Sequence, residues 1–168
     1  MGDMLVRLYD LPPLAPVLEE LRQKGVAVRR PISPEKRVVV DWVQEIFGNR
    51  WAGETEVSFA YHPPHAFIAT REGAIIGFSC HDSCKKNVFG PTGVGPSARG
   101  LGVGTALLLA SLHDMERDGY SYAVIGSAGP TDFYAKVVGA IPIPDSSNGI
   151  YRGMIDDPDD WRARPGFR

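Results

Sequence analysis

A glycine-rich stretch between a strand-like segment and a helix-like segment carries the clearest chemical signal in the sequence. From Gly90 to Gly104, six glycines and two prolines fill eight of fifteen positions, and Arg99–Thr105 leads directly into an apolar helical pattern. Glycines at the start of a helix leave its first N–H groups free of covering side chains. With the positive end of the helix dipole, these amides predict an anion site whose natural ligand is a phosphate.

Two other phosphate-binding patterns fit this stretch less well. A nucleoside-triphosphate loop ends in Gly-Lys-Ser/Thr, whereas Gly104 is followed by Thr105 with no lysine. A dinucleotide fingerprint is matched only weakly by Gly93–Ala98, because Pro96 and the late start of the helix disfavour it. A tight turn without a ligand is the remaining alternative.

A second group of reactive side chains, Cys80-His81-Asp82-Ser83-Cys84, invites a metal interpretation. One short cluster does not supply the two-by-two ligand spacing of a structural zinc site, and cysteines near a strand are commonly small buried apolar residues. We therefore expect no metal.

The elements that position these residues are predicted from hydrophobic spacing and from helix-start, helix-stop and turn signals. Helices are expected at Leu14–Lys24, Ser33–Phe47, Trp51–Tyr61, Val103–Arg117 and Thr131–Val138. Strands are expected at Met4–Leu8, Val26–Arg29, Ala66–Arg71, Ala74–Cys80, Asn87–Val94 and Tyr122–Ile125, with a last hairpin-like pair within Ile141–Met154. Gly90-Pro91 predicts a bulge or an opening of the ladder. Strands that first pair locally and then alternate with helices indicate an α/β (α+β) fold with a mixed sheet.

Composition and length set the boundaries of the interpretation. A chain of 168 residues is long enough for one domain with an ordinary core. A formal charge of −2 lacks the basic footprint of general nucleic-acid binding. The N-terminus does not read as a secretory signal, and the longest apolar run, Ala106–Ala110, is far shorter than a membrane span. We expect a cytoplasmic, soluble protein with neither nucleic acid nor membrane as a partner.

Three separated motifs resemble the GNAT-type N-acetyltransferases. Arg99-x-x-Gly102-x-Gly104 is similar to the family's pyrophosphate motif, and Phe133-Tyr134-Ala135-Lys136, followed by Gly139, is similar to its Phe-Tyr-x-Lys-x-Gly segment with one extra residue. Phe89–Val94 and Gly129-Pro130-x-x-Phe133-Tyr134 further resemble a bacterial single-domain subgroup. The resemblance covers residues 26–154, so that 1–25 would be an N-terminal strand and helix extension and 155–168 a C-terminal tail of a single domain, 1–168.

This resemblance implies a mixed, splayed sheet with helices on both faces and acetyl-CoA as co-substrate. The cofactor would lie in the gap between the strands that end near Val94 and Ile125. It would be held by backbone or side-chain groups of Thr92, Gly93, Val94, Arg99, Gly100, Leu101, Gly102, Val103, Gly104, Thr105 and Ser127. Ser127 stands where the family often has asparagine, and its hydroxyl can still hydrogen-bond the cofactor.

The resemblance also implies catalytic roles. Tyr134 would be the general acid, protonated at neutral pH because its ordinary pKa is about 10, and the Val94 N–H would polarise the thioester carbonyl. No glutamate occupies the usual position for a base, so His81 and Asp82 become the candidates, against ordinary surface and turn roles for the same residues. The residues expected to cover the acceptor, mostly as core, are Trp42, Phe47, Trp51, Tyr61 and His62.

The function implied is transfer of an acetyl group to the primary amine of a small molecule, with an amino sugar as one acceptor class. A protein or peptide N-acetyltransferase and a non-catalytic acyl-CoA-binding sensor are the alternatives. A homodimer is also compatible with the sequence.

Overall fold

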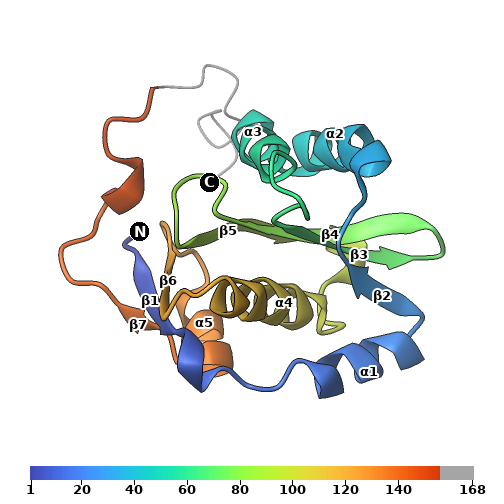
Figure 1. The fold of residues 1–168 in the computed structure, drawn as a ribbon, viewed down its shortest axis with the longest axis horizontal. Coiled ribbons are helices and arrows are strands. Elements are labelled where there is room, and N and C mark those ends of the chain that lie inside the picture. The colour runs from blue at the N-terminus through green and yellow to red at the C-terminus, as the bar shows by residue number, and fades with distance from the viewer. Residues whose placement is uncertain (156–168) are drawn as a thin grey trace.

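Seven strands form one mixed sheet in the computed structural model, which describes residues 1–155 of the chain (Figure 1). The order of the strands across the sheet is β2-β3-β4-β5-β6-β1-β7. Their bounds are β1 Met4–Arg7, β2 Val26–Arg29, β3 Ala66–Arg71, β4 Ala74–His81, β5 Val88–Val94, β6 Tyr122–Ile125 and β7 Ile141–Pro142. Every neighbouring pair is antiparallel except β5 and β6, which run parallel. The expected mixed sheet is confirmed.

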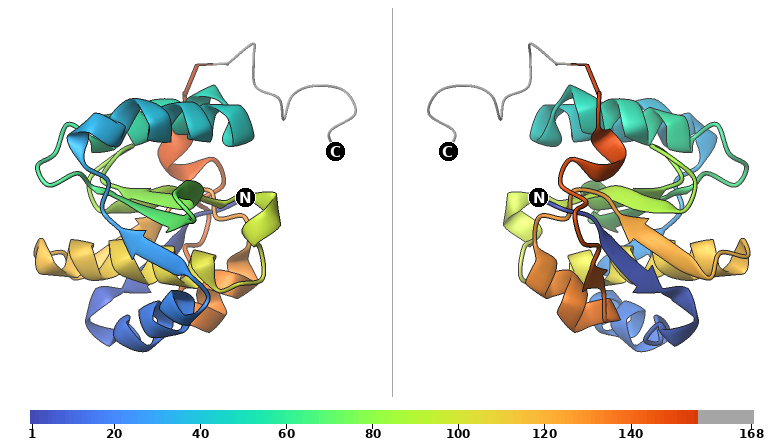
Figure 2. Two further views of the ribbon diagram at one scale, coloured as in Figure 1. Left: turned by 90° about the vertical axis from the view of Figure 1, so that its right-hand side faces the viewer. Right: turned by 90° about the vertical axis from the view of Figure 1, so that its left-hand side faces the viewer.

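Helices cover both faces of this sheet. The α-helices of the described residues are α1 Ala15–Gln23, α2 Lys36–Phe47, α3 Asn49–Ser58, α4 Val103–Arg117 and α5 Thr131–Val138. Helices α2 and α3 lie on one face, and α1, α4 and α5 lie on the other (Figures 1 and 2). Helix α4 packs between the sheet and the neighbouring helices, which explains why Leu107, Leu108 and Leu112 are all fully buried. Within residues 1–155, no helix combines the length and apolar character needed to cross a membrane.

The parallel pair β5–β6 is held together over a very short distance. Only Val88–Val124 and Phe89–Ile125 are paired. Strand β5 continues to Val94 while it stays paired with β4, whereas β6 ends at Ile125. Pro91, inside β5, has no N–H to donate to a ladder. The sheet therefore splits between β5 and β6 beyond Phe89, at the interruption that the sequence predicted.

The N-terminal strand occupies the inside of the sheet. Strand β1 lies between β6 and β7 and pairs antiparallel with both. The buried Asp3 carboxylate accepts hydrogen bonds from the backbone N–H of Ser127, at 2.8 Å, and of Ile150, at 3.3 Å. One acidic side chain thus joins the start of the chain, the segment after β6 and the C-terminal 3₁₀ turn Gly149–Tyr151. The division of one domain into residues 1–25 and a core of 26–154 remains a prediction, but β1 is a structural part of that sheet.

The prediction of a hairpin-like pair of strands within Ile141–Met154 is wrong. Strand β7 is only two residues long and pairs with β1, and the segment that follows contains a 3₁₀ turn in place of a second strand. Pro142 and Pro144 remove two ladder donors, and β1 takes the position that a hairpin partner would need. Other expected elements appear with shifted ends, and Ser33–Glu35 forms a separate 3₁₀ turn before α2. The tail beyond Ile155 lies outside the described residues.

The internal position of β1 predicts a large effect of truncating its buried side chain. Met4 is 2% exposed and packs in the core beneath α4 and α5, whereas Arg7 of the same strand is exposed. We expect Met4→Ala to lower the free energy of unfolding by about 3 kcal/mol through lost burial and a residual cavity. Arg7→Ala, the matched control, should change it by less than about 0.5 kcal/mol. Urea titration followed by circular dichroism measures both, and equal small losses would contradict the structural role of β1.

Candidate functional site

The start of α4 presents backbone donors that the protein itself does not use. Gly102 is the N-terminal cap with φ +94°, and no side chain caps the helix there. Within the described residues, the N–H groups of Gly102, Val103, Gly104 and Thr105 have no hydrogen-bond acceptor. Four consecutive free donors at the positive end of a helix dipole suit an anion such as a pyrophosphate.

Glycine is required in this turn for conformation as well as for access. Gly100 and Gly102 have φ of +81° and +94°, and a Cβ built on either would meet no atom within 4 Å. The positive φ values explain why these residues are glycine. The empty space beside them leaves the amides of the turn open to a ligand.

The inner edge of β5 turns alternate backbone groups toward the split. Gly95 donates its N–H to Ile76 on β4, so in this antiparallel register Gly93 also points toward β4. Thr92 and Val94 therefore point their N–H and C=O groups the other way. Because pairing between β5 and β6 ends at Phe89, these groups have no strand partner on that side. An extended ligand with amide groups could complete this ladder.

Tyr134 lies beside the point where the split begins. Its ring meets Phe89, the last β5 residue paired with β6, edge-on with centroids 6.4 Å apart. The side chain is 6% exposed, and burial raises the pKa of its hydroxyl to about 12. No group of the described residues hydrogen-bonds this hydroxyl. Tyr134 thus remains protonated over the whole neutral range with its proton uncommitted.

Ser127 follows β6 on the other side of the split. Its backbone has φ +48°, and Asp3 holds its N–H. The hydroxyl has no partner among the described residues. The structure therefore brings the glycine-rich turn, the β5 edge, Tyr134 and Ser127 to the same gap in the sheet; the individual roles expected of them remain predictions.

On the opposite face of the sheet, Glu54 of α3 is a titratable group that the sequence interpretation missed. Its Oε2 atom is buried without a hydrogen-bond partner, and burial raises the pKa of the carboxyl to about 7. Burial raises the pKa of the Cys84 thiol and of the Tyr151 hydroxyl, and the negative charge of Glu54 raises both further. Tyr151 in turn packs against Gly126, where an added Cβ would meet its ring at 3.2 Å. Glu54 therefore belongs to the group of side chains that covers the end of β6.

A sequence signal for Glu54 existed. It stands three residues after Trp51 and four before Ser58, which is the spacing of one helix face. Since Trp51 was among the residues expected to cover the acceptor, Glu54, three residues later, could have been assigned to the same helix face.

His81 and Asp82 lie on the α4 side of the sheet, away from α3. The His81 side chain is fully buried, so the surface alternative for it is wrong, and its Nε2 is 3.1 Å from Oδ2 of Asp114 on α4. The Asp82 carboxylate accepts hydrogen bonds from the Asn87 N–H at 2.7 Å and the Tyr120 hydroxyl at 3.2 Å. The Asp82 carboxylate is thus occupied by hydrogen bonds, whereas His81 contacts Asp114 through Nε2 and has no partner at Nδ1 within the described residues. A base role for either residue remains a prediction.

The aromatic residues expected near the acceptor divide into two sets. Phe47 stacks on Trp51 with centroids 5.1 Å apart, and its ring lies so close to Gly93 that a Cβ there would meet it at 2.4 Å. These rings, with Trp42, form the apolar layer between α2, α3 and the sheet. Tyr61 instead stacks on His65, at 3.9 Å. The first set therefore borders β5 on the α3 side, as part of the core.

Comparisons with known proteins agree with this geometry. The model of the Acetyltransferase (GNAT) family matches residues 36–140. No curated protein matches the chain.

Solved structures share the fold at low identity. The GCN5-related glucosamine N-acetyltransferase region of a fungal multi-domain GH3 β-N-acetylglucosaminidase has a TM-score of 0.68 at 14% identity, over 84% of this chain and 19% of that protein. A GCN5-related N-acetyltransferase from Sphaerobacter thermophilus has a TM-score of 0.64 at 22% identity, over 84% and 48% of the two chains. A tandem GNAT protein from the clavulanic acid biosynthesis pathway has a TM-score of 0.52 at 17% identity, over 84% and 49%. This chain thus spans about half or less of each.

The free amides of α4 generate a charge-specific prediction. Gly102→Asp would place a carboxylate over those N–H groups, where it competes with and repels a phosphate, whereas Gly102→Asn has the same shape and the same backbone strain without the charge. We expect coenzyme A to bind Gly102→Asp at least tenfold more weakly than Gly102→Asn, a difference of about 1.4 kcal/mol. Isothermal titration calorimetry measures both affinities. Equal affinities would mean that the phosphates do not lie at this helix end.

Proposed function

Because the chain belongs to the GNAT acetyltransferase family, we propose that it transfers an acetyl group from acetyl-CoA to the primary amine of a small molecule. The observation that carries this proposal is the split between β5 and β6 with free donors along it. The unpaired backbone groups of Thr92 and Val94 lie near the free amides at the start of α4, because a Cβ built on Gly104 would lie 3.7 Å from the Val94 side chain. A pantetheine chain offers amides for the first set, and its pyrophosphate suits the second.

The proposed chemistry needs one acid and one base, and the structure offers one on each face of the sheet. The amine nitrogen attacks the thioester carbonyl carbon, a C–N bond forms and the C–S bond breaks. Tyr134 gives its proton to the leaving sulfur, since its hydroxyl is protonated and has no other partner. The Val94 N–H, directed into the split, stabilises the charge that develops on the carbonyl oxygen, an effect worth about 3 kcal/mol in comparable sites.

We assign the base to Glu54. Glu54 is carried by α3 and Tyr134 by α5, and these helices lie on opposite faces of the sheet (Figure 1). In the proposed arrangement, an amine entering from the α3 side meets the carboxylate while the sulfur faces the tyrosine. A carboxyl with a pKa of about 7 is ionised in about half of the molecules at neutral pH and can take a proton from an ammonium or amine. Its negative charge also favours a cationic acceptor. His81 and Asp82 remain the alternative base candidates.

An amino sugar is the acceptor class that we place first. The support is the fold shared with a glucosamine N-acetyltransferase region at 14% identity and the Glu54 carboxyl, whose buried Oε2 has no hydrogen-bond partner within the described residues and could pair with one amine. A polycationic acceptor would need more than one such partner.

Thiol release from acetyl-CoA tests the function directly. We expect release that depends on added glucosamine, with polyamines, amino acids and peptides as comparison acceptors, measured with a thiol-reactive dye. Tyr134→Phe should lower kcat about 10²-fold or more while leaving coenzyme A affinity within about twofold, because only proton transfer is lost.

The outcomes of this assay separate the candidate functions. Tight acetyl-CoA binding without thiol release for any amine would indicate a sensor. Release with peptides alone would indicate a protein N-acetyltransferase.

The raised pKa of Glu54 predicts the pH dependence. The base must be ionised, so kcat/KM should rise with pH through about 7 and level off above it. Glu54→Gln should lower kcat/KM about 10²-fold and remove this acidic limb. Acceptors whose amines differ in pKa provide the control, because a limb that moves with the acceptor would belong to the substrate and contradict the assignment.

The raised pKa of Glu54 also predicts how the stability of the fold depends on pH. Activity should rise with pH, whereas stability should fall. In the folded protein the pKa of the Glu54 carboxyl is about 7, above its ordinary value of 4.5. Between pH 4.5 and 7, the folded state therefore keeps a proton on this carboxyl that the unfolded state has released. Stability should therefore fall as pH rises through this window, by about 3 kcal/mol at most. In urea titrations, Glu54→Gln should be more stable than the wild type at pH 8 and similar to it at pH 4. A variant that is less stable at pH 8 would mean that the carboxylate is not buried unpaired.

A further inference from the structure

A cluster of histidines and aspartates lies on the α4 face of the sheet and has no role in the reaction when Glu54 is the base. His65 precedes β3, His81 ends β4, and their rings stack with centroids 4.4 Å apart. Asp114 and Asp118 come from consecutive turns at the C-terminal end of α4, and Asp82 follows β4. We refer to these five residues as the histidine cluster.

The imidazole of His81 is buried in the protein interior, with its ring nitrogens lacking hydrogen-bond partners among residues 1–155. Its side chain is 0% exposed, and neither of its ring nitrogens makes a hydrogen bond within the described residues. Nδ1 of His65 and Oδ2 of Asp114 are also buried without a hydrogen-bond partner. A buried polar atom left in this state costs about 1–3 kcal/mol. Of these four atoms, Nε2 of His81 and Oδ2 of Asp114 lie 3.1 Å apart, and Nδ1 of His65 lies 3.5 Å from Oδ2 of Asp82, whereas Nδ1 of His81 has neither a hydrogen-bond nor an ion-pair partner within the described residues. This fully buried imidazole nitrogen, set among carboxylates, indicates that a group from outside the chain completes the cluster.

The net charge of the histidine cluster indicates which kind of external group would complete it. Three carboxylates, those of Asp82, Asp114 and Asp118, face the two rings, and Arg30 forms an ion pair with Oδ1 of Asp114. One guanidinium faces three carboxylates, so the carboxylates outnumber the fixed positive charge of the cluster. The C-terminal end of α4 adds the negative end of its dipole. A divalent cation would neutralise this excess in a single step.

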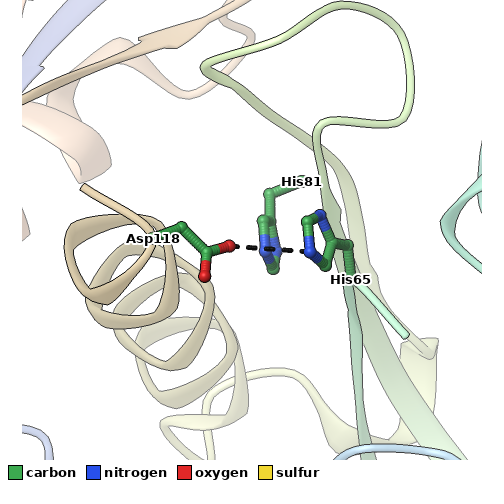
Figure 3. A group of neighbouring side chains, drawn as sticks. All are labelled: His65, His81 and Asp118. Atoms are coloured by element: carbon green, nitrogen blue, oxygen red, sulfur yellow. Dashed lines mark ion pairs between the residues drawn. The ribbon is translucent and has the colours of Figure 1, made fainter. Parts of the chain in front are cut away.

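We propose that the histidine cluster binds a divalent transition-metal ion, Zn²⁺ being the best match, through His65, His81 and Asp118. One possible ligand atom from each lies within 4.8 Å of the others (Figure 3). Imidazole nitrogen with carboxylate oxygen is a ligand set that Zn²⁺ prefers, at about 2.0–2.2 Å. Ligand atoms around such an ion are about 3.4 Å apart, so the three must draw together. Asp118 has the freedom to do this, because its side chain is 43% exposed at the helix end.

Neighbouring groups orient the ligands as they do in metal sites. Nε2 of His65 faces Asp118 and its Nδ1 faces Asp82, each at 3.5 Å. This is the arrangement in which a carboxylate holds the second nitrogen of a metal-binding histidine. The Tyr120 hydroxyl, 3.2 Å from Oδ2 of Asp82, fixes that carboxylate in turn. Asp114, with Oδ1 on Arg30 and Oδ2 3.1 Å from Nε2 of His81, offers the fourth ligand.

The ion would fasten the end of α4 to the paired ends of β3 and β4. His81 donates its backbone N–H to His65 at 3.0 Å, so both imidazoles are carried by one rigid ladder. We therefore expect a structural ion, and the expectation of a protein without metal would then be wrong. The ligands come from three separate segments, which no single sequence cluster could reveal.

Metal binding to the tag-free, full-length protein tests the proposal. After dialysis against a chelator, ZnCl₂ is titrated against a chromogenic zinc indicator, and thermal unfolding is followed at increasing free Zn²⁺. We expect one ion per chain, and a melting temperature that rises with free Zn²⁺ because the ion binds the folded state. CoCl₂ should give the visible absorption of a four-coordinate site.

Matched variants identify the ligands. Asp118→Asn alters an exposed side chain, and His65→Phe keeps a ring in the stack; each should weaken Zn²⁺ binding at least tenfold. His113→Gln, on the same helix but outside the cluster, should bind as the wild type does. Zn²⁺ that binds all four proteins equally, or binds the wild type only at millimolar concentration, would overturn the proposal, and two protons would then balance the charge.

Discussion

The early end of pairing between β5 and β6 is the constraint on which the rest of the structure depends. A parallel pair held at only two positions leaves a row of backbone donors and acceptors inside the sheet. Such groups are costly when buried without partners. The chain cannot close this gap itself, because β6 ends at Ile125 and Pro91 interrupts β5. A ligand that is itself an extended chain with amides would pair with these groups, which is the reason that we propose the split as the binding site.

Helix α4 connects the two polar features of the molecule. Its middle is apolar on all sides, with Leu107, Leu108 and Leu112 fully buried, so the helix is held rigidly. The two ends of α4 favour ions of opposite charge. Free amides at Gly102–Thr105 favour an anion, and carboxylates at Asp114 and Asp118 favour a cation. A ligand at either end would restrain the same element.

The two groups proposed for proton transfer depend on different layers. Tyr134 is set by the core beneath the sheet, where its ring meets Phe89. Glu54 belongs to α3, and its surroundings are completed by Tyr151 from the C-terminal segment. That segment is held by Asp3, which also fixes Ser127. The N-terminal strand thus contributes to the site without a residue of its own in it.

The sequence by itself determined the features that depend on neighbours along the chain. The glycine turn, the start of α4, the hairpin of β3 and β4 and the interruption at Gly90-Pro91 all follow from local spacing and backbone freedom, and the residue motifs led to the family. Tertiary structure decided what depends on distant partners. It inserted β1 between β6 and β7, which excluded the last hairpin, and it buried His81 against Asp114. It also left Glu54 without a hydrogen-bond partner and brought His65 and Asp118 together. Local periodicity can indicate which face of a helix or strand is covered. It does not indicate which distant side chain will lie against a buried group, and for this reason the pairing of charges and hydrogen bonds had to come from the tertiary structure.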